Sequence, residues 1–328
     1  MIGKLLAGCA ALALCPAAAH AQNAPIDVAG AITLDLASAV AGDGDKRLRA
    51  LTNLDLTADA DLDAVLGWQG GKAHVYVLDN RGARPNDAAE TLQGVDNIEV
   101  AHAGLRLFEA WIEQDIGPAT TLRAGLYDLN SEFYTNPAAG LLIAPPFGIG
   151  SELAATGPNG PSIFPSSALA LRLRTALAGN KGYAQVAAVN ARASTLGDST
   201  GVDFSFREGL LLIGEAGISQ GPLRGSIGLW HYTRPRADLF ETDAAGNPQR
   251  RASQGAYAVI EGDLLREDTR QLTAFVRAGL SDPHTGPFTG GVQTGLTLQP
   301  DLQWIRHPGG KAAAEDSAIA TLRIVYAF

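Results

Sequence analysis

The run Leu169-Ala170-Leu171-Arg172-Leu173-Arg174 places a leucine at every second position, with alanine or arginine between them. Successive side chains of an extended strand point to opposite faces, so the leucines share one face and the arginines the other. An arginine that faces lipid at the middle of a membrane costs about 2–4 kcal/mol. If this run spans a membrane, its leucines therefore face lipid and its arginines face a polar interior.

The same two-residue period recurs along the chain in segments separated by polar or Gly/Pro-rich connectors. It is clear in 121–127, in 271–278 and in 108–113, where we expect Phe108 on the apolar face opposite Glu109. In 210–218 it is less regular. Helical periodicity is nearly absent apart from a short piece near 62–66. This pattern is typical of a transmembrane β-barrel, although a secreted, sugar-binding β-sandwich would show it too.

The connectors favour the barrel, because their lengths alternate. We predict about fourteen strands. The long connectors 81–103, 129–167, 192–207 and 235–251 all follow odd-numbered strands, and tight turns follow most even-numbered ones; the exception is 59–71. Membrane barrels have short periplasmic turns and longer extracellular loops, so we expect both termini in the periplasm. The predicted strands are 28–40, 47–58, 72–80, 104–115, 120–128, 168–177, 182–191, 208–219, 222–234, 252–263, 269–280, 288–298, 300–307 and 317–328.

Both ends of the chain carry export and assembly patterns. Lys4, an apolar run over 5–14 and the Ala19-His20-Ala21 cleavage pattern predict a signal peptide over 1–21 and a mature domain over 22–328. Residues 6–9 also resemble a lipoprotein acylation box, but cleavage before Cys9 would leave too few residues for a full apolar region of a signal peptide. At the other end, Tyr326 and the terminal Phe328 share the apolar face of a last strand. This pattern predicts recognition by the outer-membrane assembly machinery.

Other classes of function fit poorly. The formal charge of −9 argues against a nucleic-acid partner. Both cysteines lie within the signal peptide, and no histidine pair has metal-ligand spacing, so we expect no cofactor and no metal. The motif Gly217-Ile218-Ser219-Gln220-Gly221 matches a hydrolase elbow, but that motif needs a following helix, and Pro222 and another strand follow instead. We therefore expect no enzymatic activity.

Several separated blocks resemble the carbohydrate-selective porins of the OprB family, from about residue 28 to the end. This resemblance implies a sixteen-stranded barrel that admits monosaccharides by diffusion. Segments 288–291 and 298–301 nearly abut here, where the family usually has more sequence, so a strand pair is expected to be missing. The prediction is an all-β, antiparallel up-and-down transmembrane barrel of about 14–16 strands. The blocks are 106–114, 122–134, 157–165, 255–279, 298–304 and 307–310.

A porin needs a polar lumen and a constriction. We predict that 130–167, in the longest connector, folds into the barrel and forms the constriction; the alternative is that it covers the barrel mouth. We expect nine residues to line the pore and contact sugar. The alternative is that these side chains only pair across neighbouring strands and make the wall rigid. They are Glu109, Trp111, Glu113, Arg123, Tyr127, Arg172, Arg174, Glu215 and Arg277.

The leading functional prediction is therefore an outer-membrane porin of a Gram-negative bacterium for passive diffusion of carbohydrates and other small hydrophilic solutes. The alternative is a sealed or narrow barrel with a structural or adhesive role. Expected partners are outer-membrane lipid, lipopolysaccharide, the assembly machinery and small sugars. Monomer and homotrimer both remain open.

Overall fold

The computed structural model describes residues 24–42, 45–179, 181–267, 270–296, 301–305 and 317–327, with side chains from 24 to 265 and from 272 to 295. The predicted signal peptide and Phe328 lie outside the described residues, and so does the Tyr326 side chain. No described helix combines the length and the apolar character that a membrane crossing requires.

Fourteen strands form one antiparallel sheet, as the alternating pattern predicts. Each strand pairs with its neighbour in the chain from β1 to β9, then β9 pairs with β12 and β12 with β13. The strands are β1 (Ile26–Ala41), β2 (Arg49–Asp61), β3 (Gly71–Gly82), β4 (Gly104–Asp115), β5 (Thr120–Tyr127), β6 (Ala168–Leu177), β7 (Gly182–Asn190), β8 (Leu210–Gln220), β9 (Leu223–Tyr232), β12 (Gln254–Glu267), β13 (Arg270–Ser281), β14 (Gly290–Leu296), β15 (Asp301–Ile305) and β16 (Ser317–Ala327).

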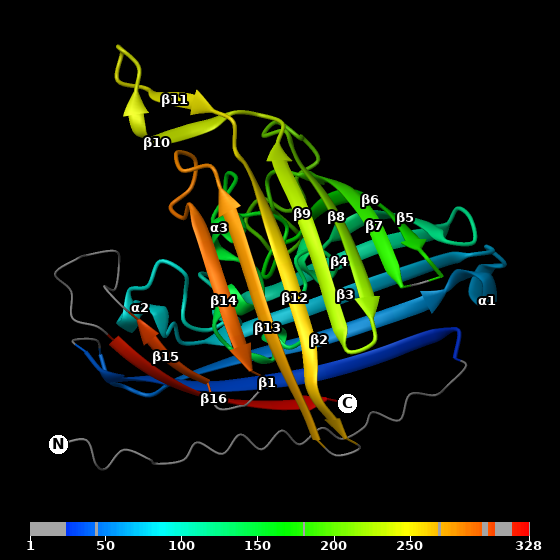
Figure 1. Ribbon diagram of the computed structural model, residues 1–328, viewed down its shortest axis with the longest axis horizontal. Helices are drawn as coiled ribbons and strands as arrows, with labels where there is room; N and C mark the ends of the chain where they lie inside the picture. Colours follow the sequence, from blue (N-terminus) through cyan, green and yellow to red (C-terminus); the bar gives the residue numbers. More distant parts are fainter. Residues whose placement is uncertain are drawn as a thin grey trace.

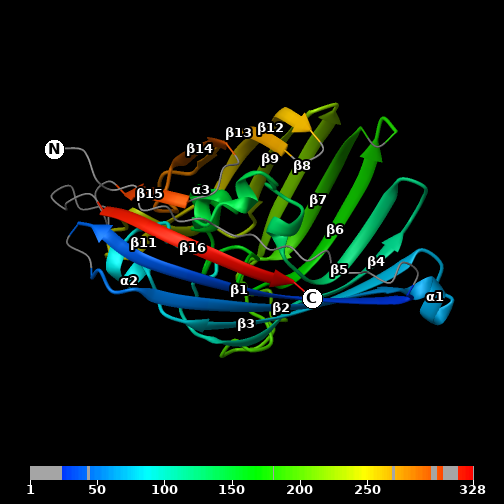
Figure 2. The same cartoon turned by 90° about the horizontal axis from the view of Figure 1, so that it is seen from below.

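The sheet curls strongly, so that β14 and β15 come near each other in both views (Figures 1 and 2). β1 pairs with β16, which joins the two ends of the chain as an up-and-down barrel requires. β14 and β15 are the two outer strands, and no ladder joins them within the described residues. The two strands predicted at 288–298 and 300–307 are thus present as β14 and β15, but among the described residues they are not neighbours in one ladder.

The connectors contain short elements of their own. The helix expected near 62–66 is α1 (Leu62–Leu66). The connector 235–251 holds a hairpin that the sequence did not predict, β10 (Arg236–Thr242) and β11 (Pro248–Arg251), which projects from the end of the sheet that carries the long connectors (Figure 1). The other short elements are α2 (Asn86–Ala89), η1 (Leu129–Ser131), η2 (Ala139–Leu141), η3 (Pro145–Phe147) and α3 (Ser151–Ala154).

The two faces of the strands differ as predicted. Leu171 and Val276 on the outer face are each 51% exposed, whereas Arg172 and Arg277 on the inner face are 1% and 0% exposed. Aliphatic side chains thus cover the outside, and charged and aromatic ones point inward. This arrangement suits a hydrocarbon environment outside and a polar one inside.

One expected orientation is wrong. The β3–β4 register shifts between Tyr76 and Val77, so that Phe108 is an extra residue opposite them. This β-bulge turns Phe108 inward, where it is 2% exposed and contacts the rings of Tyr76 and Phe164 edge-on. A bulge adds one residue to a strand and resets the alternation beyond it, which a strict two-residue period does not anticipate.

Several inward aromatic rings lie flat over a glycine of the neighbouring strand. A Cβ atom at Gly228 would lie 2.1 Å from Cζ of Tyr257, and one at Gly217 would lie 2.5 Å from Cε1 of Tyr183. Any side chain at these glycines would therefore push the ring into the interior. Rings packed over strand glycines stabilise the sheet while keeping the wall thin.

The serine motif at 217–221 lies at the end of β8 and in the turn to β9. No helix follows Ser219, so the predicted tight turn is confirmed.

Candidate functional site

The longest connector, residues 128–167 between β5 and β6, runs through the interior of the curled sheet (Figure 2). The backbone N–H of Tyr134 donates to Glu215 Oε2 of β8 at 2.8 Å, and that of Ala138 donates to Glu261 Oε2 of β12 at 2.8 Å. Further along, the carbonyl of Phe147 accepts from Arg277 Nη1 of β13 at 2.9 Å. Because these anchors point inward from three strands, the connector crosses the interior rather than only covering the mouth.

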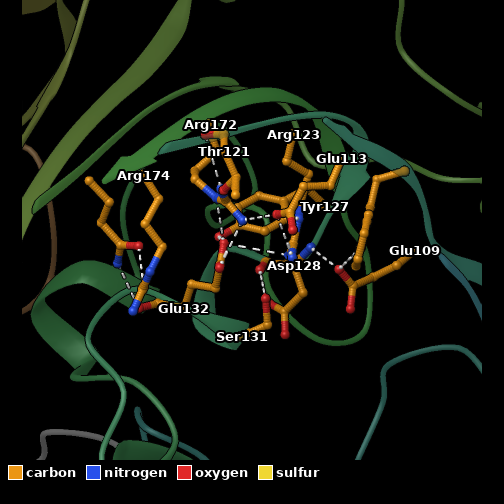
Figure 3. Close-up of polar contacts among 12 residues, drawn as sticks. Glu109, Glu113, Thr121, Arg123, Tyr127, Asp128, Ser131, Glu132, Arg172 and Arg174 are labelled. Carbon is orange, nitrogen blue, oxygen red and sulfur yellow. Dashed lines mark hydrogen bonds and ion pairs between the residues drawn. The ribbon is translucent and has the colours of Figure 1, made fainter. Parts of the chain in front are cut away.

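Glu132 ties the connector to the wall at its start (Figure 3). Arg172 of β6 donates from Nε to Glu132 Oε2 at 2.7 Å and from Nη2 to Glu132 Oε1 at 2.9 Å. The Tyr127 hydroxyl donates to Glu132 Oε2 at 2.7 Å, and Arg123 Nη1 lies 3.5 Å from the same oxygen. A two-point guanidinium–carboxylate contact fixes both groups in one plane, so this end of the connector is held rigidly.

Glu113 of β4 completes this charge cluster from the wall. Arg123 Nε donates to Glu113 Oε2 at 3.0 Å, and Arg172 Nη2 donates to the same oxygen. Arg172 also donates from Nη1 to Thr121 Oγ1 at 2.6 Å. The cluster therefore holds two arginines and two glutamates, and its charges balance within the interior.

Beside the cluster lies an aromatic stack. The guanidinium carbon of Arg123 lies 3.6 Å from the centroid of the Trp111 ring, and the His74 ring stacks on Trp111 at 4.9 Å. Trp111 Nε1 donates to Glu109 Oε2 at 3.1 Å, and the backbone N–H of Asp128 donates to that oxygen at 3.0 Å. Hydrogen bonds and a cation–π contact thus fix the ring of Trp111.

Asp128 lies where β5 enters the connector, outside the strands. Burial raises the pKa of the Asp128 carboxyl well above its usual range, and the nearby charge of Glu109 adds to this effect. A hydrogen bond from the N–H of Asn130 to Asp128 Oδ1, at 2.9 Å, only partly offsets it.

Glu215 of β8 is a second anchor, and it is 4% exposed. Besides the N–H of Tyr134, its carboxylate accepts from the hydroxyls of Tyr183 and Tyr257, each at 2.7 Å, and from Gln185 Nε2 at 3.0 Å. Four donors satisfy the buried carboxylate, as a buried charge requires.

The third anchor joins β13 to the middle of the connector. Arg277 packs its guanidinium carbon 4.5 Å from the centre of the Tyr134 ring, and the Tyr134 hydroxyl donates to Glu152 Oε1 at 2.7 Å. Glu152 is 1% exposed and lies against Gly279, where a Cβ atom would be 1.8 Å from Glu152 Oε1. Only glycine leaves room for this carboxylate.

The predicted site residues divide into two groups. The first group is buried beneath the connector, away from an open lumen, and its contacts agree with the alternative that these residues only make the wall rigid. This group is Glu113, Tyr127, Arg172, Glu215 and Arg277. Trp111, Arg123 and Arg174 are half-buried, so sugar contact remains a prediction for these three. Glu109, at 6% exposure, instead orients Trp111.

The sequence interpretation missed the partners that make this arrangement. Glu132, Gln185 and Glu261 anchor the connector, yet none of them was a candidate. Glu132 lies within the block 122–134, and it is one of three acidic residues in a connector without lysine or arginine, which was the available signal. The alternation identified inward residues but not which connector residue would meet them.

One group of described residues has the spacing for a metal ion. Ligand atoms of Asp238, Glu241 and His284 lie within 4.8 Å of one another. The Asp238 carboxylate already accepts from Arg251 and from two backbone N–H groups. Hydrogen bonds within the protein therefore explain why these three side chains lie together. The group fastens the hairpin β10–β11.

Residues 45–299 match the sequence model of the family "Carbohydrate-selective porin, OprB family". The chain belongs to this family. It is accordingly an outer-membrane channel for small solutes, and its residues Glu132 and Arg172 lie well within the matched range. The comparison with curated proteins gives no match.

Solved structures agree on the fold. The high-pH structure of Pseudomonas putida OprB is 18% identical, with a TM-score of 0.80, and the match covers 93% of this chain and 94% of that one. The low-pH structure of the same porin is 16% identical, with a TM-score of 0.52 and coverage of 93% of each chain. At these identities the likeness shows the OprB-type barrel fold alone.

Proposed function

We propose that this porin passes carbohydrates and other small hydrophilic solutes by passive diffusion, without catalysis, and that the connector 128–167 forms its constriction. The long connectors would face the cell exterior and the short turns the periplasm, in keeping with the usual asymmetry of such barrels. The observation that carries this proposal is the anchoring of the connector across the interior by Glu132, Glu215 and Arg277.

The anchors suit a constriction because they fix its width. A pore discriminates by its diameter and by the polar groups that line it, so a loosely held loop would select poorly. Here buried carboxylates accept from the connector backbone, and a buried guanidinium donates to its carbonyls. The Tyr134 ring also stacks on Tyr257 of β12 at 3.9 Å between centroids.

Trp111, Arg123 and Arg174 are the proposed sugar contacts. Sugar hydroxyls accept hydrogen bonds from guanidinium groups, and the apolar face of a sugar can pack on an aromatic ring. All three side chains point inward and keep part of their surface accessible. Trp111→Ala and Arg174→Gln should weaken current block by glucose while leaving the strands intact.

Planar-bilayer conductance of refolded protein tests the constriction. Deletion of 137–160 should raise single-channel conductance, because it removes the segment that crosses the interior. Unchanged conductance in a deletion variant that still shows the heat-dependent gel shift of a folded barrel would reject the proposal. The milder variant Glu132→Gln keeps the whole connector and tests its anchoring if the deletion variant does not fold.

A sealed or narrow barrel with a structural or adhesive role is the second candidate. It is favoured by the apolar cluster that fills part of the interior, where Phe133, Leu153 and Trp230 are each at most 3% exposed. Liposome swelling separates the two candidates. A porin admits glucose faster than a larger oligosaccharide, whereas a sealed barrel admits neither.

The remaining expectations belong to the same proposal. Residues 1–21 would direct export, and Tyr326 with Phe328 would engage the outer-membrane assembly machinery. Lipid and lipopolysaccharide would surround the barrel. Cross-linking in detergent distinguishes a monomer from a homotrimer.

A further inference from the structure

A cavity of about 420 Å³ lies between the connector and the wall, near the short turns. Its volume is in the lower part of the range of small-molecule sites, about 300–1,000 Å³. The connector contributes residues 135–137, and the wall contributes residues of β6, β7, β8, β9 and β12. Its charged lining residues are Arg174, Lys181, Arg224 and Glu261.

The cavity wall holds a buried donor without a partner. Asn136 is 5% exposed, and its Oδ1 accepts from the N–H of Ala139 at 3.1 Å, which fixes the orientation of the amide. Its Nδ2 then points away with no hydrogen-bond partner among the described residues. Arg224 Nε is buried and unpartnered in the same way. Buried donors are normally satisfied, so these two indicate a missing acceptor.

The charges point to the same kind of ligand. Arg224 pairs with Glu261 and lies 3.7 Å from Asp263. Arg174 donates to the neutral Gln185 at 2.7 Å and lies over Tyr183, and within the described part of the chain no carboxylate pairs with it or with Lys181. The cavity thus has positive charges in surplus within a chain of net charge −9.

We propose that this cavity is a binding site for the carboxylate of an acidic monosaccharide, a uronate or an aldonate, on its way through the pore. Resting on the proposed function, this inference names the substrate class that the pore favours. The Asn136 amide, the Arg174 guanidinium, which pairs with no carboxylate among the described residues, and the Lys181 ammonium would supply donors to the carboxylate. The hydroxyls of Thr135, Ser219 and Ser226 would face the sugar hydroxyls.

Current block by a matched pair of sugars tests the site. Galacturonate and galactose share one ring and differ at the carboxylate. In planar bilayers, galacturonate should half-block the current at a concentration about tenfold lower than galactose does, as expected for a charge-assisted hydrogen bond. The difference should shrink at high salt, because salt screens partly exposed charges. Equal block by the two sugars overturns the proposal.

Two variants locate the effect. Arg174→Gln and Lys181→Gln should each weaken galacturonate block about tenfold. Lys181 is not among the proposed contacts for neutral sugars, so Lys181→Gln should leave galactose block within about twofold. Arg207→Gln is the control, because it removes the same charge from an exposed connector residue outside the cavity. Lys181 is exposed in a turn, so its substitution does not threaten folding. Galacturonate block that is unchanged in Lys181→Gln and Arg174→Gln contradicts the site.

The outcomes separate this inference from the proposed function. Block by galactose without preference for galacturonate leaves the porin standing and rejects the acidic-sugar site. If no pore forms, the proposed function fails. Equilibrium binding of galacturonate to the folded protein in detergent then decides whether the site exists, with Lys181→Gln as the comparison.

Discussion

Arg172 of β6 and Glu132 of the connector form a two-point ion pair, with N–O distances of 2.7 and 2.9 Å, across forty positions of sequence. Arg172 is 1% exposed, so this contact is made away from solvent. It explains why the connector turns into the barrel where β5 ends. The charge cluster around it includes the wall residues Glu113 and Arg123 (Figure 3).

Glu132→Gln should loosen the constriction. The glutamine amide keeps the shape of the side chain but loses its charge. Breaking a buried ion pair costs about 3–5 kcal/mol of stability. The cost is lower here, because Arg172 keeps Glu113 as a partner. We expect a lower unfolding temperature in detergent and a larger, noisier single-channel conductance. Asp87→Asn, which removes an exposed acid, is the control. Conductance and stability equal to those of the parent chain would contradict the anchoring role.

Asp128 should make stability depend on pH. Its pKa is raised by burial and by Glu109, so the folded state holds a proton that the unfolded state releases near pH 4. The protonated Asp128 carboxyl therefore makes its full contribution to the free energy of unfolding below the pKa that it has in the unfolded chain. This contribution is lost as pH rises through the pKa that it has in the folded protein. Asp128→Asn should raise the unfolding temperature at neutral pH and flatten this dependence. An unfolding temperature in the parent chain that rises over the same interval would refute the assignment.

Gly279→Ala should displace the middle of the connector. The new Cβ atom would lie 1.8 Å from Glu152 Oε1 and 2.7 Å from the Tyr134 hydroxyl, so the pair must move. We expect a wider and less selective pore in the glucose-against-oligosaccharide swelling assay. Gly104→Ala in β4 is the matched control, since its Cβ would meet nothing within 4 Å. Equal selectivity in both variants would show that the contact does not set the pore width.

Asp238→Asn should free the hairpin β10–β11. Burial opposes ionisation of Asp238, but N–H donors from Phe240 and Glu241, together with Arg251 and His284, hold its pKa well below the usual range. The neutral amide keeps the shape but not the charge that Arg251 pairs with. Limited proteolysis of folded protein should cut within 236–251 faster in the variant. Cleavage at the parental rate would mean that the hairpin is held by other contacts, such as the Leu239 N–H to the His284 carbonyl at 2.8 Å.

The sequence predicted the sheet well because its signal is local. The alternation in 169–174 assigns Leu171 outward and Arg172 inward without knowledge of any neighbour, since the geometry of a single strand imposes it. The family blocks and the sorted connector lengths added the barrel. The count of alternating segments gave about fourteen strands, as in the sheet, where the family resemblance implied sixteen. The short helix at 62–66 and the turn at 217–221 followed from equally local patterns.

What only the tertiary structure decided is the filling of the barrel. The bulge at Phe108, the hairpin β10–β11 and the meeting of Glu132 with Arg172 each depend on groups that are not adjacent in the strand where the pattern is read. A two-residue period says which side of the wall a charge occupies. Which partner neutralises it there depends on how a forty-residue connector satisfies its buried polar groups, and that is settled by long-range hydrogen bonds.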